Sequence, residues 1–171
     1  KFGSDIVFIS AHDELYNGVA NATHGDRAPI VIDGPGEYEA KGLSIHGIGN
    51  ETTIDGKKLH NTSYYFSLED INILFLGAFR DVDHMEEIYK RTSDVDIVFL
   101  PLGDFLTPAQ AYKLAVNLEA KIVIPMSVSG EKDKFLEALA KEGKGKEVVD
   151  KLTIKKKDLQ GKNGDIIFIK Q

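Results

Sequence analysis

Six short runs of apolar residues, rich in Ile, Val and Phe, recur along this chain of 171 residues. Apolar runs of four to eight residues bounded by polar or glycine-containing stretches are typical of buried β-strands, and they are too short for most helices. The chain is therefore expected to fold around β-sheet. The six runs are Asp5–Ser10, Pro29–Asp33, Ile71–Gly77, Asp96–Leu100, Lys121–Pro125 and Asp165–Lys170.

The first half of the chain favours antiparallel pairing. Residues 37–46 alternate loosely between apolar and polar, as a half-buried strand does, and the polar stretch 47–60 contains an Asp-Gly turn signal. Residues 61–68 and 71–77 are joined by Glu69 and Asp70 alone, which predicts an antiparallel hairpin. We expect the polar stretch to be a connection rather than part of a strand.

Strands alternate with helices in the second half. Residues 83–92 look helical, and a second helix is expected to begin at Thr107, with Pro108 in its first turn. A third helix is predicted near residues 131–141, and a late strand around 152–155. We expect Ile97–Phe99 and Ile122–Ile124 to be buried. A mixed α/β domain spanning residues 1–171 follows, because that length suits one domain.

Composition narrows the classes of function. There are no cysteines, which excludes a disulfide framework and a thiol nucleophile, and no apolar run is long enough to span a membrane. The formal charge is −6, so a basic footprint for nucleic acid is absent overall. The excess of basic residues after residue 130, including Lys155–Lys157, is interpreted as a solvated guard on a strand edge. A cytoplasmic protein is expected.

Two motifs and their order carry a family resemblance. GPGEY at residues 34–38 and LPLGDFLTPAQA at 100–111, followed by IPM at 124–126, are similar to the small metal-dependent hydrolase branch of the metallo-β-lactamase superfamily. The resemblance covers nearly the whole chain. It implies a four-layer αββα sandwich of mixed sheets. Related proteins have strands before the segment that matches Asp5–Ser10, so we expect a fold abridged at its N-terminus.

The resemblance also implies where metal ligands should lie. Such enzymes hold two zinc or iron ions with a His-x-His-x-Asp-His loop, a hairpin His, an Asp and a further His. The hairpin His is expected within residues 50–53, which read NETT. Of the remaining positions only Asp13 offers a metal ligand, so no zinc, iron or manganese is expected. Those positions hold Ala11, Asp13, Leu15, Tyr16, Ala78 and Ser127.

Two alternatives stay open. A metal site could be rebuilt around His12, Asp13 and Asp81, with a one-residue shift that also recruits Glu14. Another rebuilt set combines Asp81 with His24, Asp26 and Glu37. A metal-free hydrolase or ligand-binding protein could instead use Ser10, His12 and Ser127, if these loops converge at one sheet end.

The expected function is that of a catalytically inactive relative that has lost its metal ligands and serves as a binding or scaffold module. Neither a cofactor nor a membrane is expected. Self-association through an exposed sheet edge is predicted, because a fold abridged before its first strand would leave such an edge uncovered. The residues do not name a substrate.

Overall fold

The computed structural model describes residues 3–14, 16–26, 28–127, 141 and 146–169. Within these described residues there are ten strands and three α-helices, and one 3₁₀ turn at Lys156–Leu159 precedes the last strand. The helices are α1 (Val19–Ala22), α2 (Glu86–Arg91) and α3 (Pro108–Asn117). The strands are β1 (Ile6–Phe8), β2 (Ile30–Ile32), β3 (Gly36–Ala40), β4 (Leu43–Ile54), β5 (Lys57–Leu68), β6 (Ile71–Phe75), β7 (Ile97–Leu102), β8 (Ile122–Ser127), β9 (Lys146–Val149) and β10 (Asp165–Ile169).

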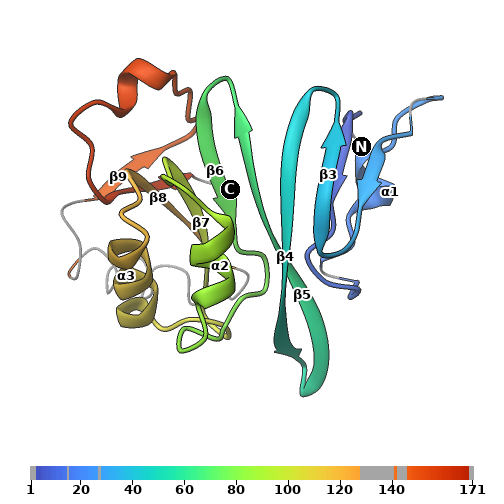
Figure 1. Ribbon diagram of the computed structural model, residues 1–171, viewed down its shortest axis with the longest axis horizontal. Coiled ribbons are helices and arrows are strands. Elements are labelled where there is room, and N and C mark those ends of the chain that lie inside the picture. Colours follow the sequence, from blue (N-terminus) through green and yellow to red (C-terminus); the bar gives the residue numbers. More distant parts are fainter. Residues whose placement is uncertain (1–2, 15, 27, 128–140, 142–145, 170–171) are drawn as a thin grey trace.

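Eight of these strands form one mixed sheet in the order β3-β4-β5-β6-β7-β8-β10-β9. Pairing is antiparallel from β3 to β6 and parallel from β6 to β9. The remaining strands, β1 and β2, form a separate parallel pair. Figure 1 shows the long β4–β5 hairpin in the middle of the molecule, with β1–β3 on one side and β7–β10 on the other.

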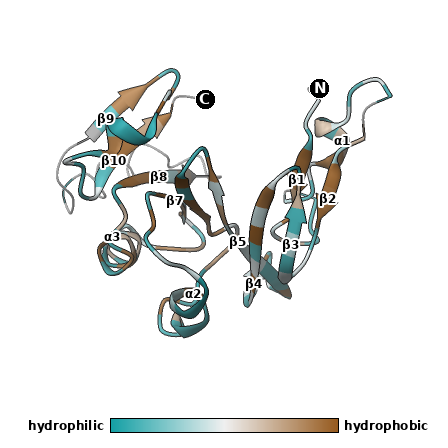
Figure 2. Cartoon of the chain, turned by 45° about the horizontal axis from the view of Figure 1, so that its top comes forward, coloured by the Kyte–Doolittle hydropathy of each residue, from teal (hydrophilic) through white to brown (hydrophobic). Residues whose placement is uncertain are grey.

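The two faces of the larger sheet are covered differently. Leu74, Val98 and Val123 point to the face that carries α2 and α3, where they pack with Ile88 and Leu114. On the opposite face the β1–β2 pair covers the antiparallel end of the sheet. The result is the α/β sandwich of mixed sheets that the sequence predicts. Figure 2 shows the apolar colouring concentrated on the strands, whereas the helices carry one polar side.

Helix α3 begins where predicted. Thr107 is its N-cap, and its hydroxyl accepts a hydrogen bond from the Gln110 backbone N–H at 3.3 Å. Gln110 Oε1 accepts in return from the Thr107 backbone N–H at 3.0 Å, and Pro108 occupies the first turn. Both interactions satisfy backbone donors that a helix start leaves unpaired. No helix among the described residues is long and apolar enough to cross a membrane.

Several predicted boundaries were wrong. The strand expected at 37–46 is two strands, separated by a turn at Lys41 and Gly42, both at positive φ. The polar stretch 47–60 is mostly strand, because β4 and β5 are each 12 residues long and turn at Asp55–Gly56. The backbone pairing of these two strands does not depend on apolar side chains. Their polar side chains alternate between the faces, so that Glu51 faces solvent while Thr52 is buried.

The late part of the chain also differs from expectation. Residues 152–155 are not a strand, and the strand beside β10 is β9 at Lys146–Val149. Leu152 and Ile154 instead pack as a loop on the sheet. Phe99 is only half-buried, although its neighbours Ile97 and Val98 are buried as predicted. The helix predicted at 131–141 lies outside the described residues except for its last position.

Candidate functional site

The loop that follows β1 meets the end of β6, a central strand of the larger sheet. This edge of the sheet is formed by strand ends and not by an edge strand. Ala11 forms an antiparallel bridge with Asn61, and the Thr62 backbone N–H donates to the Ser10 carbonyl at 2.7 Å. Ala11 and Ala78 are both buried and belong to one apolar cluster. The remaining members of that cluster are Ile54, Tyr16, Leu59 and Phe105. Of the positions that the resemblance implies for metal ligands, Ala11, Tyr16 and Ala78 lie together in this cluster, and they contribute two methyl groups and a phenol ring.

A network of uncharged side chains holds the backbone at the end of β6. Asn61 is fully buried, and its Oδ1 accepts from the Ala78 backbone N–H at 2.7 Å, while its Nδ2 donates to the Leu76 carbonyl at 3.0 Å. Ser63 also donates to the Leu76 carbonyl, and Thr52 Oγ1 donates to the Ala78 carbonyl at 2.5 Å. These polar groups therefore fix main chain.

Asn61 and Thr52 were missed by sequence reasoning. For Asn61 the sequence does hold a signal. Three small polar residues, Asn-Thr-Ser at 61–63, begin a run that continues with the aromatic residues Tyr-Tyr-Phe in the same predicted strand. All three of these polar residues are buried. Buried polar side chains nearly always have hydrogen-bond partners, so such a run inside a strand predicts a local network.

Gly77 permits the close approach of the β1 loop. Its φ is +63°, and an ideal Cβ would lie 2.4 Å from Ser10 Cβ and 2.6 Å from Asn61 Oδ1. Only glycine fits there, because both the left-handed backbone and the contact distance exclude a side chain. Ser10 is buried against this glycine.

Aromatic and cationic groups close the cluster on one side. The Tyr16 and Phe105 rings lie 5.9 Å apart in an edge-to-face arrangement, and Arg80 Cζ lies 5.6 Å from the Phe105 ring centre. The Arg80 guanidinium also donates to the Asp104 carbonyl. Burial, followed by the charges of Asp13 and Asp104, raises the pKa of Tyr16 to about 12. At neutral pH its phenol is uncharged.

The fold and this edge of the sheet can now be compared with known proteins. A model of the β-lactamase superfamily domain matches residues 1–127. The chain belongs to the metallo-β-lactamase superfamily. A comparison with curated proteins finds no match.

Solved structures support the same assignment. A Thermotoga maritima protein assigned to the Zn-dependent hydrolases of the metallo-β-lactamase superfamily is similar over 99% of this chain and 83% of its own, with 26% identity and a TM-score of 0.72. YhfI from Bacillus subtilis, a metallo-β-lactamase fold protein, covers 98% of this chain and is itself covered to 64%, at 9% identity and a TM-score of 0.55. Igni18 from Ignicoccus hospitalis, a metallo hydrolase, matches 80% of this chain and 71% of its own at 17% identity and a TM-score of 0.52. The similarity to YhfI and Igni18 shows a shared fold and nothing more.

The residues at this edge do not fit the metals of the superfamily. A catalytic zinc takes about three protein ligands from His, Cys, Asp or Glu. Ala11 and Ala78 have no donor atom, the Thr52 hydroxyl is bonded to backbone, and Tyr16 is an uncharged phenol. Within the described parts of the chain, no three His, Cys, Asp or Glu side chains are grouped so that they could hold a metal ion. Leu15 and the Ser127 side chain lie outside the description.

The alternative site residues are dispersed. His12 is exposed beside an open depression that Asp13 and Glu14 also line. Asp81 lies instead against His84, whose Nδ1 is 2.9 Å from both carboxylate oxygens, and this hydrogen bond raises the pKa of His84. His24 and Asp26 are exposed on another loop, and Glu37 lies 3.8 Å from Arg91. Neither rebuilt metal set forms a cluster.

Proposed function

We propose that this chain is a metallo-β-lactamase-fold module that binds rather than hydrolyses, and that it works without the metal ions of its superfamily. One observation carries the proposal: Ala11 and Ala78, at positions where the family resemblance implies metal ligands, are buried and pack in one apolar cluster with Ile54 and Phe105. A hydrolase of this fold needs its metal to lower the pKa of a bound water to about 7.

The surrounding chemistry supports a binding role. Asn61, Ser63 and Thr52 are engaged with the backbone of residues 76–78, so they stabilise the edge. Ser10 is packed against Gly77, and His12 is exposed. This separation does not favour a metal-free hydrolase that uses Ser10 and His12.

We further propose that the module is cytoplasmic, since a chain without cysteines suits a reducing compartment.

Hydrolysis assays test the proposal. Purified protein is incubated with phosphodiester, lactone and β-lactam substrates, with and without added zinc, iron or manganese. We expect no turnover above the rate of a matched His12→Ala, Asp13→Ala double variant. Turnover that depends on added metal and is lost in that variant would establish a rebuilt site and overturn the proposal. Metal-independent turnover lost in Ser10→Ala would overturn it equally.

A further inference from the structure

A depression of about 290 Å³ lies between the β4–β5 hairpin and the segment that follows β6. The hairpin contributes residues near its turn, and the segment after β6 contributes two residues that come shortly after Ala78. The residues of this lining are Glu51, Thr52, Thr53, Lys58, Arg80 and Asp81. All of them are polar or charged, and the volume is close to the lower limit of small-molecule sites. The depression therefore suits a small polar ligand.

The Arg80 side chain is held in place from two sides. Its Cζ lies 5.6 Å from the ring centre of Phe105, which is a cation–π contact, and its guanidinium donates to the Asp104 carbonyl. Phe105 in turn packs in the apolar cluster of Ala11 and Ala78. A fixed positive charge thus stands beside positions at which the family resemblance implies metal ligands.

One nitrogen of Arg80 makes this placement costly. Nε is buried and has no hydrogen-bond partner among the described residues. Buried polar atoms nearly always have partners, so an exception in a native fold points to a role of the side chain that offsets the cost. Arg80 as a whole is only half-buried and lines the depression. Its guanidinium is therefore available to a ligand there, although Nε itself is covered.

Two further donors border the depression from the hairpin. Lys58 is exposed and pairs in register with Thr53, so their side chains lie on the same face of the hairpin. The Thr52 hydroxyl is already used, since it donates to the Ala78 carbonyl. A guanidinium, an ammonium and a hydroxyl from separate strand ends can donate to different oxygens of one ligand. A tetrahedral phosphate offers enough oxygens for all three, whereas one guanidinium satisfies a carboxylate.

Three acidic residues at or near the depression bear on the affinity for an anion. The Asp81 carboxylate is bonded to His84, whose Nδ1 is 2.9 Å from both of its oxygens. Asp104 is exposed and contacts Arg80 through its backbone carbonyl. Glu51 is exposed in the lining itself. Its charge opposes a bound anion, so removal of that charge should raise the affinity.

We propose that this depression binds the phosphate group of a small molecule. Arg80 and Lys58 supply positive charge, and the Thr53 hydroxyl supplies a third donor. The inference rests on the binding role proposed above, because it names the class of ligand for that role. A cation that belongs to the chain itself, rather than a metal ion, then attracts the anion.

Titration of the whole chain with inorganic phosphate, followed by heteronuclear NMR at neutral pH and constant ionic strength, tests the site. The Arg80 Nε–H signal should be observable, because burial slows exchange of its proton with water, and it should shift and saturate together with the Thr53 amide. We expect binding about tenfold weaker in Arg80→Met and about threefold weaker in the more exposed Lys58→Met. Glu51→Gln should bind more tightly.

The neighbouring lysine provides the matched control. Lys57 is exposed on the same strand but does not line the depression, so Lys57→Met should bind phosphate as the parent does. Circular dichroism checks the folding of each variant. Absence of a saturable shift, equal losses in the two lysine variants, weaker binding in Glu51→Gln, or acetate binding as tightly as phosphate would overturn the proposal.

The titration does not measure turnover, so it separates this inference from the binding role on which it rests. Absence of phosphate binding, with no turnover in the hydrolysis assays, would overturn the phosphate site and leave the binding role in place. Turnover in those assays with saturable phosphate binding would overturn the binding role and support the phosphate site.

Discussion

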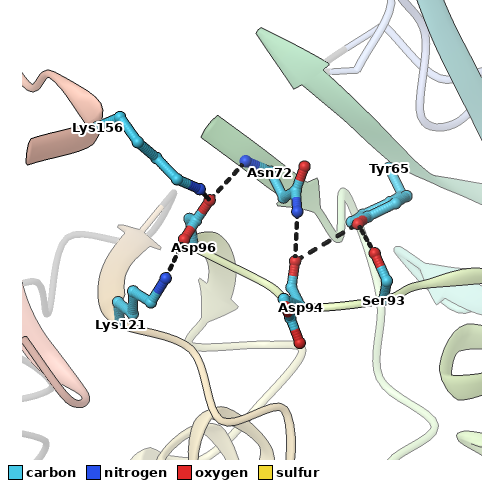
Figure 3. Close-up of polar contacts among 7 residues, drawn as sticks. All are labelled: Tyr65, Asn72, Ser93, Asp94, Asp96, Lys121 and Lys156. Carbon is cyan, nitrogen blue, oxygen red and sulfur yellow. Dashed lines mark hydrogen bonds and ion pairs between the residues drawn. The ribbon is translucent and has the colours of Figure 1, made fainter. Parts of the chain in front are cut away.

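Lys156 Nζ lies 2.7 Å from Oδ2 of Asp96, and the Asp96 side chain is fully buried (Figure 3). Lys121 Nζ lies 2.5 Å from Oδ1, and the Asn72 backbone N–H donates to Oδ2 at 2.9 Å. The carboxylate stands just before β7, while Lys156 belongs to the 3₁₀ turn of the loop 150–162. One buried charge therefore holds the loop 150–162, whose Leu152 and Ile154 pack on the sheet.

Replacing Lys156 by Met should weaken this attachment. Lys156 is about half exposed, so the full cost of breaking a buried pair does not apply, and we expect a loss of about 1 kcal/mol in the free energy of unfolding. Amide exchange should also speed up in residues 150–162. Lys157→Met is the control, because Lys157 is exposed and makes no described bond to Asp96. Equal effects of the two substitutions would contradict the assigned role of Lys156.

The same carboxylate predicts an acid limb in stability. Burial raises the pKa of Asp96, but the hydrogen bonds from Lys121, Lys156 and the Asn72 backbone outweigh it, and the net shift is downward. A folded pKa below the unfolded value of about 3.9 means that the stabilisation is present above that pH and is lost as pH falls through the folded pKa. Urea unfolding of Asp96→Asn should show a large deficit at pH 7 that shrinks below about pH 4. A deficit that stays constant would contradict the assignment.

Gly77→Ala tests the close packing of the β1 loop on β6. The new Cβ would overlap Ser10 and Asn61, so we expect a loss of about 3 kcal/mol or more, or failure to fold. Gly56→Ala is matched, because Gly56 also has positive φ but nothing lies within 4 Å of its Cβ position. That control should lose only about 1 kcal/mol in thermal or urea unfolding. Similar losses at the two positions would show that the contact is not tight.

Much of the fold could be predicted because it depends on short-range signals. Ile97–Val98 and Ile122–Ile124 are buried in adjacent parallel strands, and Thr107 caps the helix between them. The β4–β5 hairpin was underestimated because its polar residues obtain their order from backbone pairing across the turn, which the period of apolar residues does not record. The late strand was misplaced because Leu152 and Ile154 cover the sheet without joining it.

The candidate site was predictable in part. The family resemblance located Ala11 and Ala78, and the structure brings them together. The Asn61 network could not be derived from spacing, since it joins residues from β4, β5 and the end of β6 through backbone groups. Asp81 pairs with His84 within a local turn, and spacing did not predict this pairing either. It separates Asp81 from the metal site that was considered with His12 and Asp13.

Tyrosine titration tests the environment of Tyr16. Its pKa of about 12 lies above the ordinary value of 10, so the stabilisation from the neutral phenol is complete below pH 10 and is lost as pH rises towards 12. Absorbance near 295 nm should show a late-titrating phenol that Tyr16→Phe removes. If that variant instead loses a phenol titrating near pH 10, the ring is not packed as described.

Zinc stoichiometry tests the central claim most directly. Protein incubated with excess zinc is passed through a desalting column and analysed by inductively coupled plasma mass spectrometry, alongside the His12→Ala, Asp13→Ala variant. We predict far less than one zinc ion per chain for both proteins, and melting temperatures unchanged by micromolar zinc. One or two zinc ions retained by the parent and lost by the variant, with several degrees of stabilisation in the parent alone, would contradict the account.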